Sequence, residues 1–68
     1  MPADIKQALQ ERKLFEAYRS RPPYQQNDYI GWITRAKREA TRNERLAQML
    51  KELASGDRYM NMSYRPKS

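Results

Sequence analysis

The sequence predicts an all-α fold, a small three-helix bundle with a short, partly disordered C-terminal tail. Three segments carry apolar residues at helical spacing, and capping or turn signals separate them. A chain of 68 residues has room for one domain. We expect a helical domain over residues 1–57, with helices at residues 4–19, 23–38 and 42–55, and a tail over residues 58–68.

The first predicted helix begins at Asp4. Asp is a favoured N-cap residue, and Gln7 follows it at the spacing of a capping box. The Pro22-Pro23 pair ends this helix, because the residue before a proline is pushed out of the helical conformation. Its apolar surface comprises Ile5, Ala8, Leu9, Phe15, Ala17 and Tyr18.

The second predicted helix begins at Pro23, since the missing N–H of proline is harmless at the first helical position. Tyr29, Ile33 and Ala36 then recur at helical spacing. This pattern predicts a helix over residues 23–38 that packs one apolar face against its neighbours.

The third predicted helix has the clearest pattern. Thr41 and Glu44 match the T-x-x-E capping box directly before an apolar run. Gly56 suits the left-handed position that follows a helix C-terminus. Between these two signals the helical stripe consists of Leu46, Met49, Leu50 and Leu53.

The apolar faces of the three helices are expected to form one core. Trp32 is expected at its edge, partly buried. The predicted core residues are Ile5, Leu9, Phe15, Tyr18, Tyr29, Ile33, Ala36, Leu46, Met49, Leu50 and Leu53.

The C-terminal tail has no helical period. Its content of Tyr and Met is nevertheless high for a solvated linker. We expect partial order near Tyr59 and disorder beyond about Met62.

Composition excludes several kinds of chemistry. The chain has no Cys and no His, so thiolate chemistry is impossible and the usual zinc ligands are missing. Gly31 and Gly56 stand alone, so no glycine-rich phosphate loop is encoded. Such a small chain also has little room to enclose a substrate pocket. We expect no enzyme, no cofactor, no metal site and no small-molecule substrate.

The sequence also bears on the compartment. Lys6, Glu11, Arg12 and Lys13 lie where the apolar region of a signal peptide would be. No apolar run approaches the length of a membrane-spanning helix. We therefore expect a cytoplasmic protein without a membrane span.

Basic residues gather between the second and third predicted helices. The net charge of +6, from 14 basic and 8 acidic residues, favours acidic partners. Two interpretations of this cluster remain open: an anion-binding surface, or a solvated face whose cations compensate a helix C-terminus. The candidate binding surface consists of Trp32, Arg35, Lys37, Arg38, Arg42 and Arg45.

Several residues between Phe15 and Gly56 have an order and spacing that resemble a known pattern. The pattern is that of the C-terminal helical region of a bacterial family, the YdeI/OmpD-associated or bacteriocin-protection family. The order and spacing match from about residue 5 to residue 57. The residues that carry the resemblance are Phe15, Pro22-Pro23, Tyr29, Trp32-Ile33, Ala36-Lys37, Thr41-Arg42, Arg45 and Leu53-Ala54-Ser55-Gly56.

The resemblance implies that Lys37, Thr41, Arg42 and Arg45 belong to a family motif, with no catalytic set to transfer. An architectural role for this motif is favoured, in which Arg42 contacts carbonyls at the end of the second helix or a carboxylate on the first. The family names imply a link to envelope stress or to protection from antimicrobial peptides.

The function expected from the sequence is that of a non-enzymatic bacterial module, either structural or protein-binding. An unknown protein is the expected partner, contacted through the Trp32 edge and the basic turn. The alternative is a nucleic-acid- or anion-binding protein that uses the basic residues between the second and third helices.

Overall fold

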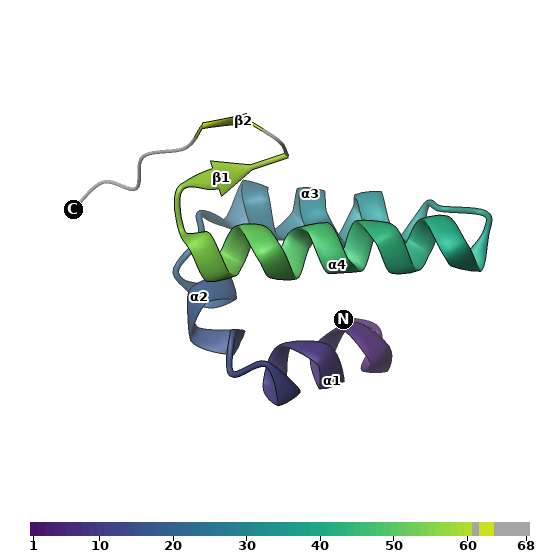
Figure 1. The fold of residues 1–68 in the computed structure, drawn as a ribbon, viewed down its shortest axis with the longest axis horizontal. Coiled ribbons are helices and arrows are strands. Elements are labelled where there is room, and N and C mark those ends of the chain that lie inside the picture. Colours follow the sequence, from purple (N-terminus) through teal and green to yellow (C-terminus); the bar gives the residue numbers. More distant parts are fainter. Residues whose placement is uncertain (61, 64–68) are drawn as a thin grey trace.

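The computed structural model describes residues 1–60 and the backbone of residues 62 and 63. This part of the chain is all-α, apart from one short hairpin that follows the last helix (Figure 1). The elements in chain order are α1 (Ala3–Glu11), α2 (Phe15–Arg19), α3 (Pro23–Thr34), α4 (Glu39–Ser55), β1 (Arg58–Tyr59) and β2 (Met62–Ser63).

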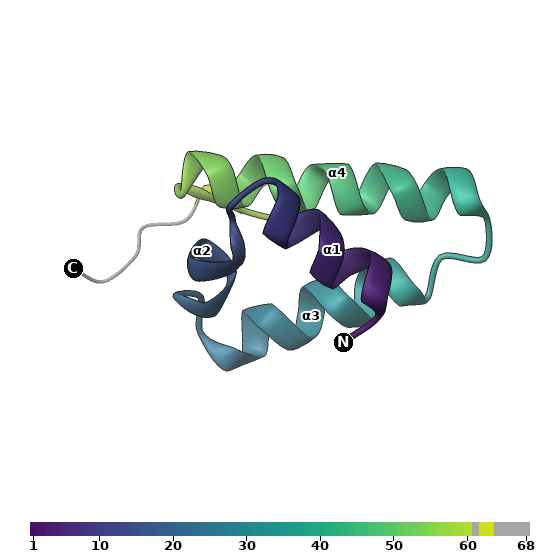
Figure 2. The same ribbon diagram turned by 90° about the horizontal axis from the view of Figure 1, so that it is seen from below.

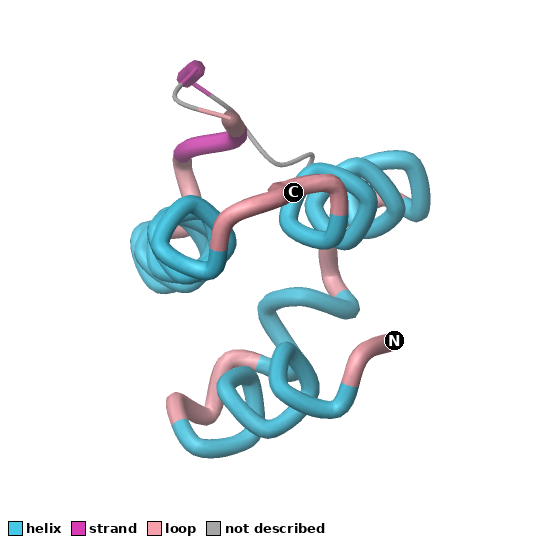
Figure 3. The backbone as a smooth tube through the Cα atoms, turned by 90° about the vertical axis from the view of Figure 1, so that its right-hand side faces the viewer, coloured by secondary structure: helices cyan, strands magenta, loops and turns pink. Residues whose placement is uncertain are grey.

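Helices α3 and α4 form an antiparallel pair, and α1 and α2 cover one side of it. Figure 3 looks along this pair and shows α1 and α2 together on the side opposite the hairpin. Figure 2 shows α1 lying across the pair, with α2 near the start of α3. The short loop between α3 and α4 favours this antiparallel packing.

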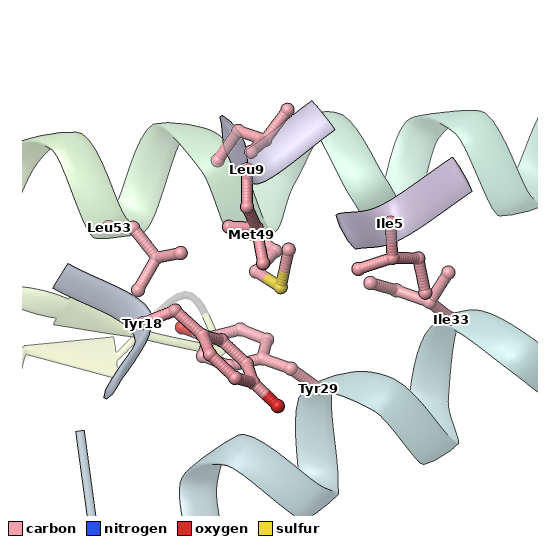
Figure 4. Packing of buried hydrophobic residues seen from close by; sticks show 8 residues of the cluster. Ile5, Leu9, Tyr18, Tyr29, Ile33, Met49 and Leu53 are labelled. Carbon is pink, nitrogen blue, oxygen red and sulfur yellow. The ribbon is translucent and has the colours of Figure 1, made fainter. Parts of the chain in front are cut away.

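The core fills the space where the helices meet (Figure 4). Phe15, Ala36 and Leu46, which the sequence places in the core, are only partly buried, as is Trp32. Those three therefore lie at the margin of the core, where Phe15 also contacts the guanidinium of Arg19. The buried apolar residues are Ile5, Leu9, Tyr18, Tyr29, Ile33, Met49, Leu50 and Leu53.

The first predicted helix, at residues 4–19, is two helices in the structure. Lys13 adopts a left-handed conformation with φ of 57° between α1 and α2. The Lys13 N–H donates to the Gln10 carbonyl at 3.1 Å, and the Leu14 N–H donates to the Leu9 carbonyl at 2.8 Å. This pair of bonds is a Schellman motif, with Lys in the position that glycine usually takes.

The break has a packing reason. Leu14, the last residue of the motif, packs against the core cluster, which is the hydrophobic contact that frequently accompanies a Schellman ending. The change of direction lets α2 bring Tyr18 into the core, where only 6% of it is exposed. A continuous helix over these residues would not make that turn.

The other helix ends also differ from the predicted ones. Helix α3 ends at Thr34 instead of residue 38, and α4 begins at Glu39 instead of residue 42. The predicted Thr41–Glu44 capping box is therefore wrong, because Thr41 lies inside α4 and Arg38 occupies the N-cap position. An early end to α3 leaves four residues for the reversal that places α4 beside it.

The C-terminal segment folds back onto the helices. Gly56 has φ of 78°, the left-handed conformation expected after α4. Strands β1 and β2 pair antiparallel, with Tyr59 opposite Met62. Tyr59, where the sequence predicts order, packs against the core. The predicted disorder beyond Met62 does not hold for Ser63, which pairs in β2, and otherwise falls on residues 64–68, outside the described residues.

Replacing Lys13 by glycine should stabilise the protein. The left-handed conformation costs a non-glycine residue roughly 1–2 kcal/mol, and glycine gives back about 0.5–1 kcal/mol through unfolded-state entropy. We expect Lys13→Gly to raise the free energy of unfolding by about 0.5–1 kcal/mol, measured by urea denaturation. Lys6→Gly, in the exposed interior of α1, is the control and should lower it by about 1 kcal/mol. Destabilisation by both changes would contradict the assigned role of Lys13.

Candidate functional site

The predicted binding surface lies at the end of the α3–α4 pair where the two helices are joined (Figure 1). Trp32 is in the last turn of α3, and Arg35 is its C-cap residue. Lys37 and Arg38 lie in the connecting loop, and Arg42 and Arg45 follow in the first turns of α4. The fold thus brings these residues together at one end of the molecule. Some of them make contacts within the protein, and others are exposed to solvent.

Arg45 fastens the end of α3 to α4. Its Nη1 donates a hydrogen bond of 2.6 Å to the Trp32 carbonyl. That carbonyl lies in the last turn of α3, where helix carbonyls have no partner within the helix. The Arg45 guanidinium also lies over the Trp32 ring, 5.3 Å from its centroid. Arg45 and Trp32 therefore form one structural unit.

Arg42 joins α4 to α1. Its guanidinium makes a bidentate contact with the Asp4 carboxylate at 3.1–3.2 Å. The sequence predicts Asp4 as an N-cap, but α1 begins at Ala3 after Pro2, so the carboxylate faces Arg42 instead. Of the two contacts predicted for Arg42, the one with a carboxylate on the first helix is present. The pair is partly exposed, at 26% and 54%, so its contribution to stability is modest.

The remaining basic residues face solvent. The Arg35 Nε donates to the Gly31 carbonyl at 3.0 Å, a contact with its own helix. Lys37 and Arg38 are exposed, and within the described residues their side chains form no hydrogen bond or ion pair. Arg38 has an extended backbone at the start of α4. Among the residues that the structure describes, Lys37 and Arg38 are therefore the cations of this surface whose side chains take no part in holding the fold together.

A buried polar cluster at the other end of the α3–α4 pair was missed by sequence reasoning. Arg21 and Gln25 are buried, with exposures of 6% and 0%. Arg21 donates through Nη1 to the Gln25 Oε1 at 3.2 Å and through Nη2 to the Glu52 carbonyl at 3.1 Å. Arg21 thus ties the α2–α3 connection to the end of α4.

Glu52 is the acidic member of this cluster, and only 4% of it is exposed. Its Oε1 accepts hydrogen bonds from the Tyr29 hydroxyl at 2.5 Å and from the Met60 N–H at 2.9 Å. Its Oε2 accepts from the Gln48 Nε2 at 3.2 Å. A buried carboxylate needs such donors, because desolvation is costly without them.

One sequence signal could have found Glu52. It lies three residues after Met49 and directly before Leu53, so it falls within the apolar stripe of α4. A charged residue in such a stripe requires a buried partner. Arg21 has no comparable signal, because it lies in a connection without a helical pattern.

An open pocket of about 520 Å³ lies beside this cluster, along the C-terminal half of α4. Its lining mixes both signs of charge. None of the predicted binding residues belongs to it. The lining residues are Gln48, Lys51, Glu52, Ser55, Asp57 and Arg58.

Comparison with known families identifies the relationship of this chain. The family described as bacteriocin-protection, YdeI or OmpD-associated matches residues 1–56. The chain belongs to the YdeI/OmpD-associated family. The matched region includes α1 to α4 and both structural arginines, Arg42 and Arg45, whereas the β1–β2 hairpin lies beyond it.

The family match is the relationship that these comparisons found for this member of the YdeI/OmpD-associated family. No curated protein and no solved structure matches the chain. In the part of the chain that the structure describes, none of the helices is long and apolar enough to cross a membrane.

Arg45 and Arg42 should differ in their effect on stability. Arg45→Ala removes a charged hydrogen bond and leaves a helix-end carbonyl without its partner, so we expect a loss of about 1.5–3 kcal/mol. Arg42→Ala removes an exposed ion pair and should cost about 0.2–1 kcal/mol. Urea denaturation measures both, with Lys37→Ala as the control, expected within about 0.5 kcal/mol of the parent. An unchanged stability in Arg45→Ala would contradict the structural role of Arg45.

Tyr29 should make the protein less stable at high pH. Burial, and then the hydrogen bond to Glu52, raise the pKa of Tyr29 above its usual value of 10.0. The folded state therefore holds Tyr29 neutral, and this contribution to stability is complete below pH 10 and is lost as pH rises above it. Urea denaturation across this range should show a steeper loss in the parent than in Tyr29→Phe. Equal slopes in the parent and in Tyr29→Phe would contradict this role of Tyr29.

Proposed function

We propose that this protein is a non-enzymatic binding module of the bacterial cytoplasm. It contacts an acidic surface on a partner protein through Lys37, Arg38 and the exposed edge of Trp32. We call these three residues the loop surface.

The observation that carries this proposal is that the basic residues differ in their contacts. Arg42 and Arg45 are held by contacts within the protein, whereas Lys37 and Arg38 extend from the loop into solvent. Arg45 holds the backbone and ring of Trp32 beside that loop. A loop that is fixed at both ends can present its charges without a large ordering cost.

The chemistry of the loop surface suits a protein partner. Aromatic and basic side chains placed together are common at protein interfaces. Charges at the rim of an interface mainly accelerate association with a surface of opposite sign. The family description, which names bacteriocin protection and OmpD association, supports a role in envelope stress or in protection from antimicrobial peptides.

The non-enzymatic part of the proposal rests on side-chain chemistry. The chain has neither His nor Cys. The carboxylate of Glu52, which borders the open pocket, is already engaged by the Tyr29 and Gln48 side chains. Such a carboxylate serves the fold and is poorly placed to accept a proton from a substrate.

Nucleic-acid binding is the alternative, favoured by the net charge of +6 and by the adjacent exposed cations Lys37 and Arg38. These two contacts would give a slope of log affinity against log salt of about −2 on duplex DNA. Titrating labelled duplex DNA and RNA at two salt concentrations measures this slope. Absence of binding at low salt would remove the alternative.

Charge reversal tests the loop surface directly. In Lys37→Glu/Arg38→Glu, repulsion should abolish capture of the proteins that the tagged parent retains from a bacterial lysate. Lys6→Glu/Arg12→Glu changes the net charge equally, at an exposed residue of α1 and at its exposed C-cap residue, and should retain them. Quantitative mass spectrometry of the captured proteins provides the readout. Equal capture by the parent and both variants, or repeated failure to capture any protein, would contradict the proposal.

A further inference from the structure

The β1–β2 hairpin lies over the α3–α4 pair, at the end opposite the loop surface (Figure 1). Tyr59 is its main anchor. The Tyr59 hydroxyl donates to the Asp28 Oδ2 at 2.5 Å. The ring makes edge contacts with the rings of Tyr24 and Tyr29, with centroid distances of 6.2 and 5.4 Å. We call Tyr24, Asp28, Tyr29 and Glu52 together the Tyr59 site.

The Tyr59 site accepts hydrogen bonds from two adjacent residues: Tyr59, which lies in β1, and Met60, which lies in the turn that follows with φ of 51°. One donor is the phenol hydroxyl, accepted by Asp28, and the other is the N–H of Met60, accepted by Glu52. Both acceptors are carboxylates, although the protein as a whole carries a charge of +6. A main-chain hydrogen bond gives affinity for a peptide, and a side-chain pocket gives specificity.

The site and its occupant lie on either side of the end of the family match. Every residue of the Tyr59 site lies within residues 1–56, the region that matches the family. The occupant begins after Gly56, whose left-handed conformation reverses the chain and directs it over the helices. The helical domain therefore provides the acceptors, and the segment after Gly56 provides the donors.

Contacts with the helices keep the hairpin in place. Each of its strands has two residues. A hairpin of this size has little stability of its own, so contacts with the helices such as those of Tyr59 and Met60 hold it in position. Such a segment opens by local unfolding while the helices remain folded.

We propose that the Tyr59 site is a docking site for a tyrosine-bearing peptide of a partner protein that turns directly after its tyrosine, and that residues 57–60 are a built-in occupant that closes it. The incoming tyrosine replaces Tyr59 between Tyr24 and Tyr29 and donates to Asp28. The N–H of the following residue donates to Glu52. This surface is separate from the loop surface, so the proposal does not depend on the proposed function.

The built-in occupant has a measurable consequence. A tethered segment acts at an effective concentration in the millimolar range, so it competes strongly with a free peptide. The apparent affinity for a free peptide falls in proportion to the fraction of open sites. Removing the Tyr59 side chain therefore increases the affinity for a peptide that carries its own tyrosine.

A peptide titration tests the proposal on the full chain. The probe is a synthetic peptide of residues 56–63, added to the ¹⁵N-labelled parent and to Tyr59→Ala, with amide shifts of residues 24–29 as readout. We expect Tyr59→Ala to bind at least about 10-fold more tightly than the parent. Adding Asp28→Asn to Tyr59→Ala should weaken binding, and a probe with its tyrosine replaced by alanine should not bind. Arg58→Ala, which keeps the occupant, should behave as the parent.

Folded Tyr59→Ala that does not bind the probe would overturn the proposal, as would equal binding by the alanine probe. Hydrogen exchange on the unaltered chain keeps the test independent of that variant. The Met60 N–H should exchange through local opening, with little dependence on urea, while the Leu53 N–H should exchange only through global unfolding. Equal protection and equal urea dependence at the two amides would also overturn it.

Discussion

Glu52 lies within the apolar stripe of α4, and its carboxylate is removed from water. Such a group is tolerated only where donors surround it, and here they come from every neighbouring part of the fold: Tyr29 of α3, Gln48 of α4 and Met60 of the hairpin. Its backbone carbonyl receives Arg21 from the α2–α3 connection. The positions of α3, the hairpin and the preceding connection therefore all depend on this one residue.

Different interactions stabilise the two ends of the α3–α4 pair. At the Glu52 end, buried hydrogen bonds in a low-dielectric environment fix the geometry, and each missing partner is expensive. At the loop end, Arg45 and Arg42 act near the surface, where water weakens charge interactions. The loop end can therefore vary its exposed cations with little effect on folding, whereas the Glu52 end cannot. The acceptors at the Glu52 end must therefore stay satisfied, whether by the hairpin or by a peptide that replaces it.

The family motif acquires a structural meaning from these contacts. Arg45 completes the end of α3 and packs on Trp32, and Arg42 pairs with Asp4 of α1. Lys37, which the resemblance assigns to the same motif, lies exposed in the loop. A single sequence motif thus combines residues that build the junction with one that the junction presents.

The sequence by itself determined the all-α class, the apolar stripes of α1, α3 and α4, and the glycine ending of α4, because periodicity and backbone preference are local properties. Only the tertiary structure decided the break at Lys13, since a non-glycine residue adopts a left-handed conformation when packing of Leu14 and Tyr18 compensates the strain. The same holds for Arg21 and Glu52, whose burial depends on donors and acceptors far apart in the chain. The apolar stripe of α4 marks Glu52 as a buried charge, but its partners, and the burial of Arg21, become visible only when the helices are placed together.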